Sequence, residues 1–199
     1  MKVHKITPEM VQSQVMNLDA VERFIAPADL VIAHNAAFDR PFCERLARGF
    51  AGKAWACSNS EVPWSALGFE GSKLGYLIGQ CGYFHNGHRA VNDCQALLEV
   101  LAHPLADDGT LPFGHLLASA RKSTVRIWAD GAPFDMKDHL KQRGYRWNNG
   151  SDGRPKCWWT EIPEEAYQDE LRFLQAEIYR ASVEPIIQTV TAHERFRLA

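Results

Sequence analysis

The sequence lacks the features of membrane-spanning, secreted and disulfide-rich proteins. It has no continuous apolar run of about eighteen residues, so no transmembrane helix is expected. Its first residues, Met1-Lys2-Val3-His4-Lys5, lack the apolar core of a signal peptide. The five cysteines form no Cys-x-x-Cys pair, and their odd number disfavours a disulfide framework. We therefore expect a cytoplasmic protein with reduced thiols and no membrane partner.

The sequence also has little net charge. With 22 basic and 24 acidic residues, the formal net charge is -2, so the whole chain exerts no electrostatic attraction on nucleic acid. Any such attraction must come from a local patch. The length of 199 residues fits one ordinary domain, or one truncated domain followed by a small second one. A hydrophobic fraction of 46% is typical of globular proteins.

Hydrophobic patterning predicts an α/β arrangement over residues 1–118. Residues 29–34 are short, apolar and β-branched, which is typical of a buried strand. The spacing from Phe38 onward predicts a helix, in which Pro41 is tolerable only within the first turn. Helices are also expected over 91–101 and 111–118, whereas 50–87 shows no regular pattern apart from a short helix at 73–78.

Residues 121–199 predict a small α+β module. Residues 123–128 alternate polar and apolar side chains, as a half-buried strand does. A helix is expected from 132 to about 143, then two strands joined by the turn-rich segment 148–153, then a long helix that begins at Pro163. A module of this size is near the lower limit for an independent core.

Two short motifs lie where predicted helices begin. His34-Asn35-Ala36-Ala37-Phe38-Asp39 follows the first apolar strand, and His88-Arg89-Ala90-Val91-Asn92-Asp93 opens a later helix. Each residue alone has a structural interpretation. An Asp early in a helix favours the helix dipole, and a His at a strand end or in a loop is usually hydrogen-bonded or solvated. The two motifs together, in this order, carry more information than either alone.

Together these motifs resemble the second and third motifs of the DEDD-superfamily 3'-5' exonucleases of the catalytic-His type. Residues 4–105 are similar to the branch that includes the epsilon proofreading subunit of bacterial DNA polymerase III, on the strength of the segment 55–64, the Leu74-Gly75 helix and the Gly82-Tyr83-Phe84 lead-in. The resemblance implies a ribonuclease H-like α/β fold, incomplete in this chain, followed by the small α+β module.

The resemblance also implies a chemistry and a set of roles. It implies hydrolysis of phosphodiester bonds by two Mg²⁺ or Mn²⁺ ions, which prefer oxygen ligands. His88 would be the general base, since the pKa of a histidine lies near the operating pH. The partners would be single-stranded or frayed DNA 3' ends, with RNA as an alternative, and a polymerase or another replication or repair protein. The implied metal ligands are Asp39 and Asp93, and the implied nucleic-acid contacts are His34, Asn35 and Phe38.

The family also needs an Asp-x-Glu pair on an earlier strand, and residues 1–33 contain none. We therefore expect the first three strands of the family fold to lie upstream of Met1, either because the gene is read too short or because the missing part is supplied elsewhere. This chain would then be inactive or weakly active. The alternative function is a non-catalytic fragment that binds nucleic acid or another protein.

Basic and aromatic residues are interleaved in the C-terminal module. Single-stranded nucleic acid binds to platforms of this composition. The other interpretation is that the aromatics form the core of a small domain while the charges face solvent, and it is the one we favour. The nucleic-acid contacts in the first interpretation are Lys141, Arg143, Arg146 and Lys156.

Overall fold

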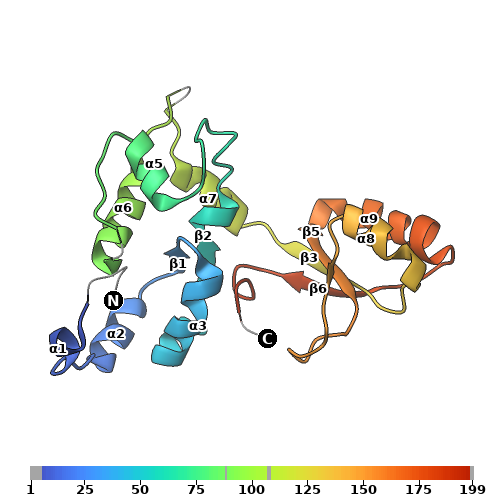
Figure 1. Ribbon diagram of the computed structural model, residues 1–199, viewed down its shortest axis with the longest axis horizontal. Coiled ribbons are helices and arrows are strands. Elements are labelled where there is room, and N and C mark those ends of the chain that lie inside the picture. Colours follow the sequence, from blue (N-terminus) through green and yellow to red (C-terminus); the bar gives the residue numbers. More distant parts are fainter. Residues whose placement is uncertain (1–5, 88, 107–108, 198–199) are drawn as a thin grey trace. The chain divides into compact units, whose positions relative to one another are not determined.

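The chain folds into two compact units, Met1–Arg121 and Lys122–Ala199 (Figure 1). The computed structural model describes residues 6–87, 89–106 and 109–197. Both units combine helices with a β-sheet, so the expected mixture of α and β structure is confirmed. The division after Arg121 lies close to the boundary expected between residues 118 and 121. Within the described residues, no helix combines the length and apolar character required to span a bilayer.

A two-stranded parallel sheet with surrounding helices forms the N-terminal unit. Strands β1 and β2 pair in register from Leu30 opposite Ala54 to Ala33 opposite Cys57. A parallel pair needs a crossover, and helix α3 supplies it. The strands of this unit are β1 (Leu30–Ala33) and β2 (Ala54–Cys57). Its helices are α1 (Pro8–Val11), α2 (Leu18–Ile25), α3 (Ala36–Leu46), η1 (Arg48–Phe50), α4 (Ser58–Glu61), α5 (Leu74–Gln80), α6 (Ala90–Ala102) and α7 (Pro112–Ala120).

The core of this unit lies between β2 and helices α5, α6 and α7. Leu77, Val100 and Leu116 are fully buried in one apolar cluster, together with Ala56 of β2. Trp64 belongs to the same buried cluster, and its indole Nε1 donates a hydrogen bond of 2.6 Å to the carbonyl of Ser58. This bond holds the segment from Ser58 to Trp64 against the core.

Two features of this unit differ from the sequence prediction. Strand β2 falls within a segment that showed no regular pattern, because it has only four residues and two of them are alanines with low β-propensity. Pro41 lies in the interior of α3 rather than in its first turn, because the helix begins at Ala36. Pro41 is buried, and its carbonyl accepts a hydrogen bond of 3.1 Å from Arg45 Nε. The helix thus continues through Pro41 although proline removes one backbone hydrogen bond.

The C-terminal unit is built on a four-stranded antiparallel sheet in the order β4-β5-β3-β6. The predicted helix after residue 132, the strands on either side of the 148–153 turn and the long helix after Pro163 are all present. Strand β6 was not predicted. The strands are β3 (Thr124–Ala129), β4 (Arg146–Trp147), β5 (Trp158–Pro163) and β6 (Ile186–Val190). The helices are η2 (Phe134–Met136), α8 (Lys137–Gln142), η3 (Glu164–Ala166), α9 (Tyr167–Phe173) and the π-helical continuation η4 (Leu174–Tyr179).

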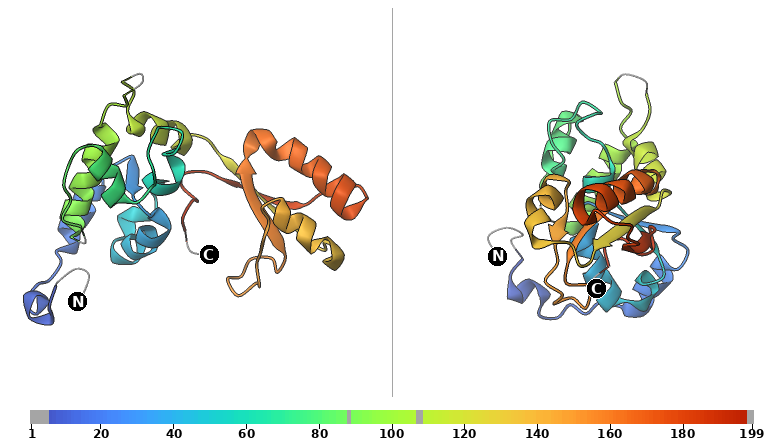
Figure 2. Two further views of the ribbon diagram at one scale, coloured as in Figure 1. Left: turned by 45° about the horizontal axis from the view of Figure 1, so that its top comes forward. Right: turned by 90° about the vertical axis from the view of Figure 1, so that its right-hand side faces the viewer.

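Helices α8 and α9 lie on the same face of this sheet (Figure 2). Beneath them, Ile127 of β3 is fully buried with Leu140 of α8 and Leu174 of η4. The opposite face carries a cross-strand network: Arg126 binds Glu161 at 2.7 Å, and its guanidinium lies 5.2 Å from the ring centroid of Trp159. Each face of the sheet is therefore stabilised by different chemistry.

Candidate functional site

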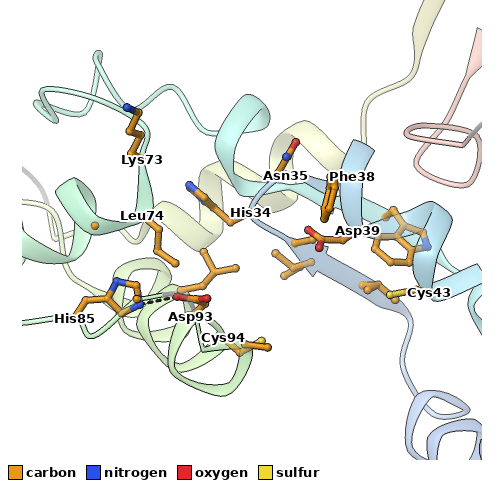
Figure 3. A pocket seen from close by; sticks show the side chains of 18 of the residues that line it. His34, Asn35, Phe38, Asp39, Cys43, Lys73, Leu74, His85, Asp93 and Cys94 are labelled. Carbon is orange, nitrogen blue, oxygen red and sulfur yellow. Dashed lines mark ion pairs between the residues drawn. The ribbon is translucent and has the colours of Figure 1, made fainter. Parts of the chain in front are cut away.

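A cavity of about 1120 Å³ opens beside β1 in the N-terminal unit (Figure 3). All of its lining residues come from this unit. In open parallel α/β sheets, ligands bind beyond the carboxyl ends of the strands, and the turn after β1 lies at this cavity. The lining includes every predicted site residue of this unit that the structure describes: His34, Asn35, Phe38, Asp39 and Asp93.

Two helices bring the carboxylates of the two motifs to this one cavity. Asp39 lies in the first turn of α3, directly after β1, and Asp93 lies in the first turn of α6. Both carboxylates line the cavity although they are far apart in the sequence (Figure 3). A carboxylate is favoured at each position by the positive end of the helix dipole. The presence of an aspartate at each position is therefore explained both by the helix dipole and by a role in a shared site.

The turn between β1 and α3 has a strained backbone at Asn35. Its φ of 145° lies in the region that favours glycine, although asparagine tolerates positive φ better than most residues. The carbonyl of Asn35 accepts hydrogen bonds from the amides of Phe38, at 2.8 Å, and Asp39, at 3.2 Å. Such strain persists only where the surrounding structure imposes it, and it is concentrated at functional sites.

His34 is oriented by a serine that the sequence analysis missed. Its Nδ1 lies 2.9 Å from Oγ of Ser58, and Ser58 Oγ donates to the carbonyl of Ala33 at 3.3 Å. Ser58 thus fixes the orientation of the imidazole ring. Nε2 is buried, and no hydrogen bond of good geometry reaches it among the described residues, although the backbone of Ser72 acts on the ring.

Burial shifts the protonation of both titratable groups near β1. Desolvation lowers the pKa of His34, which the Ser72 backbone and the charge of Asp39 offset in part. Desolvation raises the pKa of Asp39, against the effect of His34. The pKa of the Cys43 thiol is also raised, first by burial and then by the charges of Asp39 and Glu44. This side of the cavity therefore favours uncharged forms.

The carboxylate from the second motif lies close to a histidine that precedes the motif. His85 Nε2 lies 2.8 Å from Asp93 Oδ1 (Figure 3). The geometry at this nitrogen does not meet that of a hydrogen bond, so the contact is a short approach between the imidazole and the carboxylate. His88, the predicted general base, lies outside the described residues. Its assignment stays a prediction.

The described residues do not form a two-metal centre. No group of three or more His, Cys, Asp or Glu side chains in the described part of the chain is arranged to hold a metal ion. Two carboxylates line the cavity, one of them close to His85. A two-metal site needs more oxygen ligands than these. The described residues therefore do not fit the Mg²⁺ or Mn²⁺ pair that the family resemblance implies.

The four basic residues predicted to bind nucleic acid belong to the C-terminal unit and do not share one surface. Lys141 Nζ lies 5.9 Å from the ring of Trp158, whereas the Arg146 guanidinium lies 4.6 Å from the ring of Trp159. Successive strand residues point to opposite faces, so these two cations lie on opposite sides of β5. Arg143 is paired with Glu170 at 3.1 Å. Lys156 is exposed in the loop before β5.

Of the tryptophans in the C-terminal unit, some pack in its interior and one is half exposed. Trp128 is buried, and its ring centroid lies 5.7 Å from that of Trp159. Trp158 packs against the apolar cluster under the helices. Trp147 is half exposed and meets Trp158 edge to face at 5.6 Å. This arrangement favours the interpretation that most of the aromatics stabilise a small domain.

Sequence reasoning missed three polar residues of the cavity: Ser58, His85 and Lys73. Lys73 and His85 line it, and Ser58 orients His34. Ser58 follows β2, which was not predicted, so no pattern placed it near His34. His85 lies three residues before His88, and the motif spacing favoured the latter. Only the His-Asn-Gly-His run itself could have drawn attention to both histidines.

Replacing His34 should reduce the acid sensitivity of the N-terminal unit. Because its pKa is lowered on folding, the unfolded chain binds a proton at His34 first, and the free energy of unfolding falls as the pH drops below about 6.5. The raised pKa of Asp39 acts in the opposite sense, since the folded state then gains a proton first. We expect His34→Gln to lose less stability between pH 7 and pH 5 than the wild type does.

Scanning calorimetry at both pH values measures this difference. The matched control is His103→Gln, which changes an imidazole at the end of α6 outside the cavity lining. If His34→Gln and the wild type lost equal stability on acidification, burial of His34 would not contribute to the pH dependence.

Comparison with known proteins gives no match: no protein-family model, no curated protein and no solved structure corresponds to this chain.

Proposed function

We propose that this chain is a DEDD-type, catalytic-His 3'-5' exonuclease-family protein whose N-terminal unit binds the 3' end of single-stranded or frayed DNA, with RNA as the alternative strand. We further propose that the chain by itself binds the strand end without hydrolysing it. One observation carries the proposal. The two motifs that resemble this family, separated in sequence, line one cavity at the carboxyl end of β1.

The cavity offers chemistry that suits a terminal nucleotide. The Phe38 side chain is 60% exposed and lines the cavity, so its ring is available for base stacking. The carboxylate of Asp39 accepts hydrogen bonds, which suits the hydroxyl groups of a 3'-terminal sugar, and the imidazole of His34 lines the cavity beside it. Lys73 supplies the positive charge that attracts a phosphate.

Binding without hydrolysis follows from the number of acidic ligands. The sequence contains no Asp-x-Glu pair, and the described residues contain no cluster of three ligating side chains. Phosphodiester hydrolysis by two metal ions depends on ligands that hold both ions against the scissile phosphate. Binding of the sugar and the base of a nucleotide does not require these metal ions. This favours the non-catalytic alternative for the chain as it stands.

The Phe38→Ala variant tests the stacking contact. Stacking of a base on an aromatic ring contributes about 1–3 kcal/mol, so we expect the variant to bind a labelled oligothymidylate about 5- to 150-fold more weakly. Fluorescence anisotropy at low salt measures the affinity. The matched control is Phe24→Ala on α2, whose side chain is 83% exposed and does not line the cavity.

A second comparison tests recognition of the strand end. An oligonucleotide with a free 3' hydroxyl should bind more tightly than the same strand with a 3' phosphate, because the Asp39 carboxylate accepts a hydrogen bond from a hydroxyl and repels a phosphate. Equal affinities for the two strands, or equal losses in Phe38→Ala and Phe24→Ala, would contradict the proposal.

A further inference from the structure

A hairpin protrudes from the sheet of the C-terminal unit (Figure 1). It spans residues 146–159 and consists of β4, the loop 148–157 and the first two residues of β5. The two strands pair antiparallel, and the N–H of Asn148 donates to the carbonyl of Cys157 at 2.9 Å, so the pairing continues into the loop. Residues 146–159, the basic hairpin, therefore form a two-stranded ribbon that ends in a loop.

Hydrogen bonds across the loop fix its shape. The side-chain amide of Asn148 donates to Asp152 Oδ1 at 3.0 Å and to the carbonyl of Pro155 at 3.1 Å. Asp152 Oδ1 also accepts from the backbone N–H of Arg154 at 3.1 Å. The hydrogen bond from Asn148 is the largest of the effects that lower the pKa of Asp152. An ordered loop has little conformational freedom left to lose when it binds a partner.

The basic hairpin carries a local excess of positive charge. The whole chain has a formal net charge of -2, whereas the hairpin has one acidic residue, Asp152, and three basic residues. Asp152 lies 3.9 Å from the guanidinium of Arg154. The other two cations, Arg146 and Lys156, are exposed, and neither is ion-paired to a carboxylate in the part of the chain that the structure describes. Their charge is therefore available to an anionic partner.

The positive charge lies on both sides of the ribbon. The Arg146 guanidinium lies 4.6 Å from the ring centroid of Trp159 on one side, and Lys141 Nζ of α8 lies 5.9 Å from the ring of Trp158 on the other. Each cation is thus held beside the ribbon by an aromatic ring. A platform for a single strand presents its cations along one groove. Cations on two sides suit a partner whose phosphates lie on two sides.

The carboxylates near the ribbon do not cancel this charge. Glu161, further along β5, is paired with Arg126 at 2.7 Å, and Asp130 lies close enough to Cys157 for its charge to act on the thiol. The cations on and beside the ribbon are Arg126, Lys141, Arg146, Arg154 and Lys156, and the carboxylates are Asp130, Asp152 and Glu161. Cations therefore outnumber carboxylates around the hairpin.

We propose that the basic hairpin inserts into the major groove of double-stranded DNA. The major groove of B-DNA is about 12 Å wide, is bounded by two phosphate backbones and admits a two-stranded ribbon, whose strands lie about 4.8 Å apart. Arg146 and Lys141 then face the phosphates of opposite backbones. The major groove of an RNA duplex is too deep and narrow for this mode of binding. The inference assigns duplex DNA to the C-terminal unit and so goes beyond the strand-end site proposed for the N-terminal unit.

The first experiment measures binding of the full chain to a closed duplex. The probe is a labelled DNA dumbbell, whose two ends are joined by loops, so it offers no 3' end to the N-terminal unit. We expect saturable binding by fluorescence anisotropy at low salt. The logarithm of the binding constant should fall against the logarithm of the salt concentration with a slope of about -3, because about three phosphates are neutralised. Absence of saturable binding at low salt, or a slope near zero, would overturn the proposal.

Charge-removing variants test whether both sides of the ribbon bind. Arg146→Gln and Lys141→Gln should each weaken binding to the dumbbell and reduce the salt slope by about one. The matched control is Arg172→Gln on α9, which removes the same charge from a side chain that is 76% exposed and lies outside the hairpin. Because Arg146 also packs on Trp159, Lys156→Gln in the loop repeats the test at an exposed position. An effect confined to one side of the ribbon, or equal to that of Arg172→Gln, would contradict insertion into a groove.

Modified duplexes locate the groove. Bulky groups attached at C5 of thymine project into the major groove, so a dumbbell that carries them should bind about tenfold more weakly. A dumbbell with an RNA stem should also bind about tenfold more weakly, because side chains do not reach into its major groove. Equal affinity for the unmodified and modified DNA stems, or for the DNA and RNA stems, would overturn the assignment to the major groove.

One further variant separates this site from the strand-end site. Phe38→Ala should weaken binding of a single-stranded oligonucleotide and leave the affinity for the dumbbell unchanged, because Phe38 lines the cavity of the other unit. An equal loss of affinity for both probes would mean that the cavity holds the duplex and would overturn the role of the hairpin. Failure of the strand-end site and failure of the hairpin site are therefore distinguishable.

Discussion

The full chain, purified and supplied with Mg²⁺ or Mn²⁺, is expected to leave a 5'-labelled single strand intact. Nuclease catalysis of this class accelerates phosphodiester hydrolysis by about 10⁶-fold or more over water, and that acceleration depends on ligands for two metal ions. The sequence has no Asp-x-Glu pair, and the described residues contribute Asp39 and Asp93 to the cavity without a third ligating group beside them. A denaturing gel over hours of incubation measures the result.

The control for this experiment is Asp93→Asn. A trace of contaminating nuclease would act equally in both preparations, whereas hydrolysis by this chain would disappear in the variant. Degradation that depends on Asp93 would show that the chain builds a working metal centre and would contradict the proposal that it binds without hydrolysis.

The second large effect concerns Arg40, whose side chain is fully buried although it is charged. Its Nε lies 2.7 Å from Glu44 Oε1, and its guanidinium carbon lies 5.6 Å from the ring centroid of Trp55. Truncating this fully buried side chain removes its packing and leaves a cavity, whereas Glu44 is partly exposed and keeps access to water. We expect Arg40→Ala to lower the free energy of unfolding of the N-terminal unit by about 2–5 kcal/mol, a large part of the stability of an ordinary domain.

The matched control is Arg45→Ala on the same helix. Arg45 is exposed, so its loss should change the free energy of unfolding by only about 0.5 kcal/mol. Hydrogen exchange of peptides from β1 and α3 reports on this unit separately from the other. Equal protection in Arg40→Ala and Arg45→Ala would mean that the buried guanidinium does not support α3.

Elements with strong local signals could be predicted from the sequence. The apolar run at Leu30–Ala33 and the periodicity of Ala90–Ala102 predicted β1 and α6 correctly, because burial on one side imposes a pattern on the sequence. The four-residue strand Ala54–Cys57 could not be predicted, since its pairing with β1 is decided by tertiary contacts. The position of Pro41 inside α3 likewise depends on packing rather than on propensity.

The residues of the candidate site could be predicted where a sequence motif coincides with the beginning of a helix. Asp39 and Asp93 were placed by their positions at the beginnings of two helices, and both line the cavity. Ser58 and His85 were not, because their relation to His34 and Asp93 exists only in three dimensions. Of the four basic residues predicted to bind nucleic acid, Lys141 and Arg146 lie on opposite sides of β5, since sequence proximity does not tell which side of a strand a residue occupies.

The separate cores of the two units have a consequence for how this protein changes over evolutionary time. Residues between 56 and 120 supply one buried cluster and residues between 125 and 178 the other, and no described residue belongs to both. A destabilising mutation in one cluster therefore cannot be compensated by repacking the other. Recombination near Arg121 would exchange whole cores without cutting through either, so each half can be inherited, duplicated or replaced as a unit.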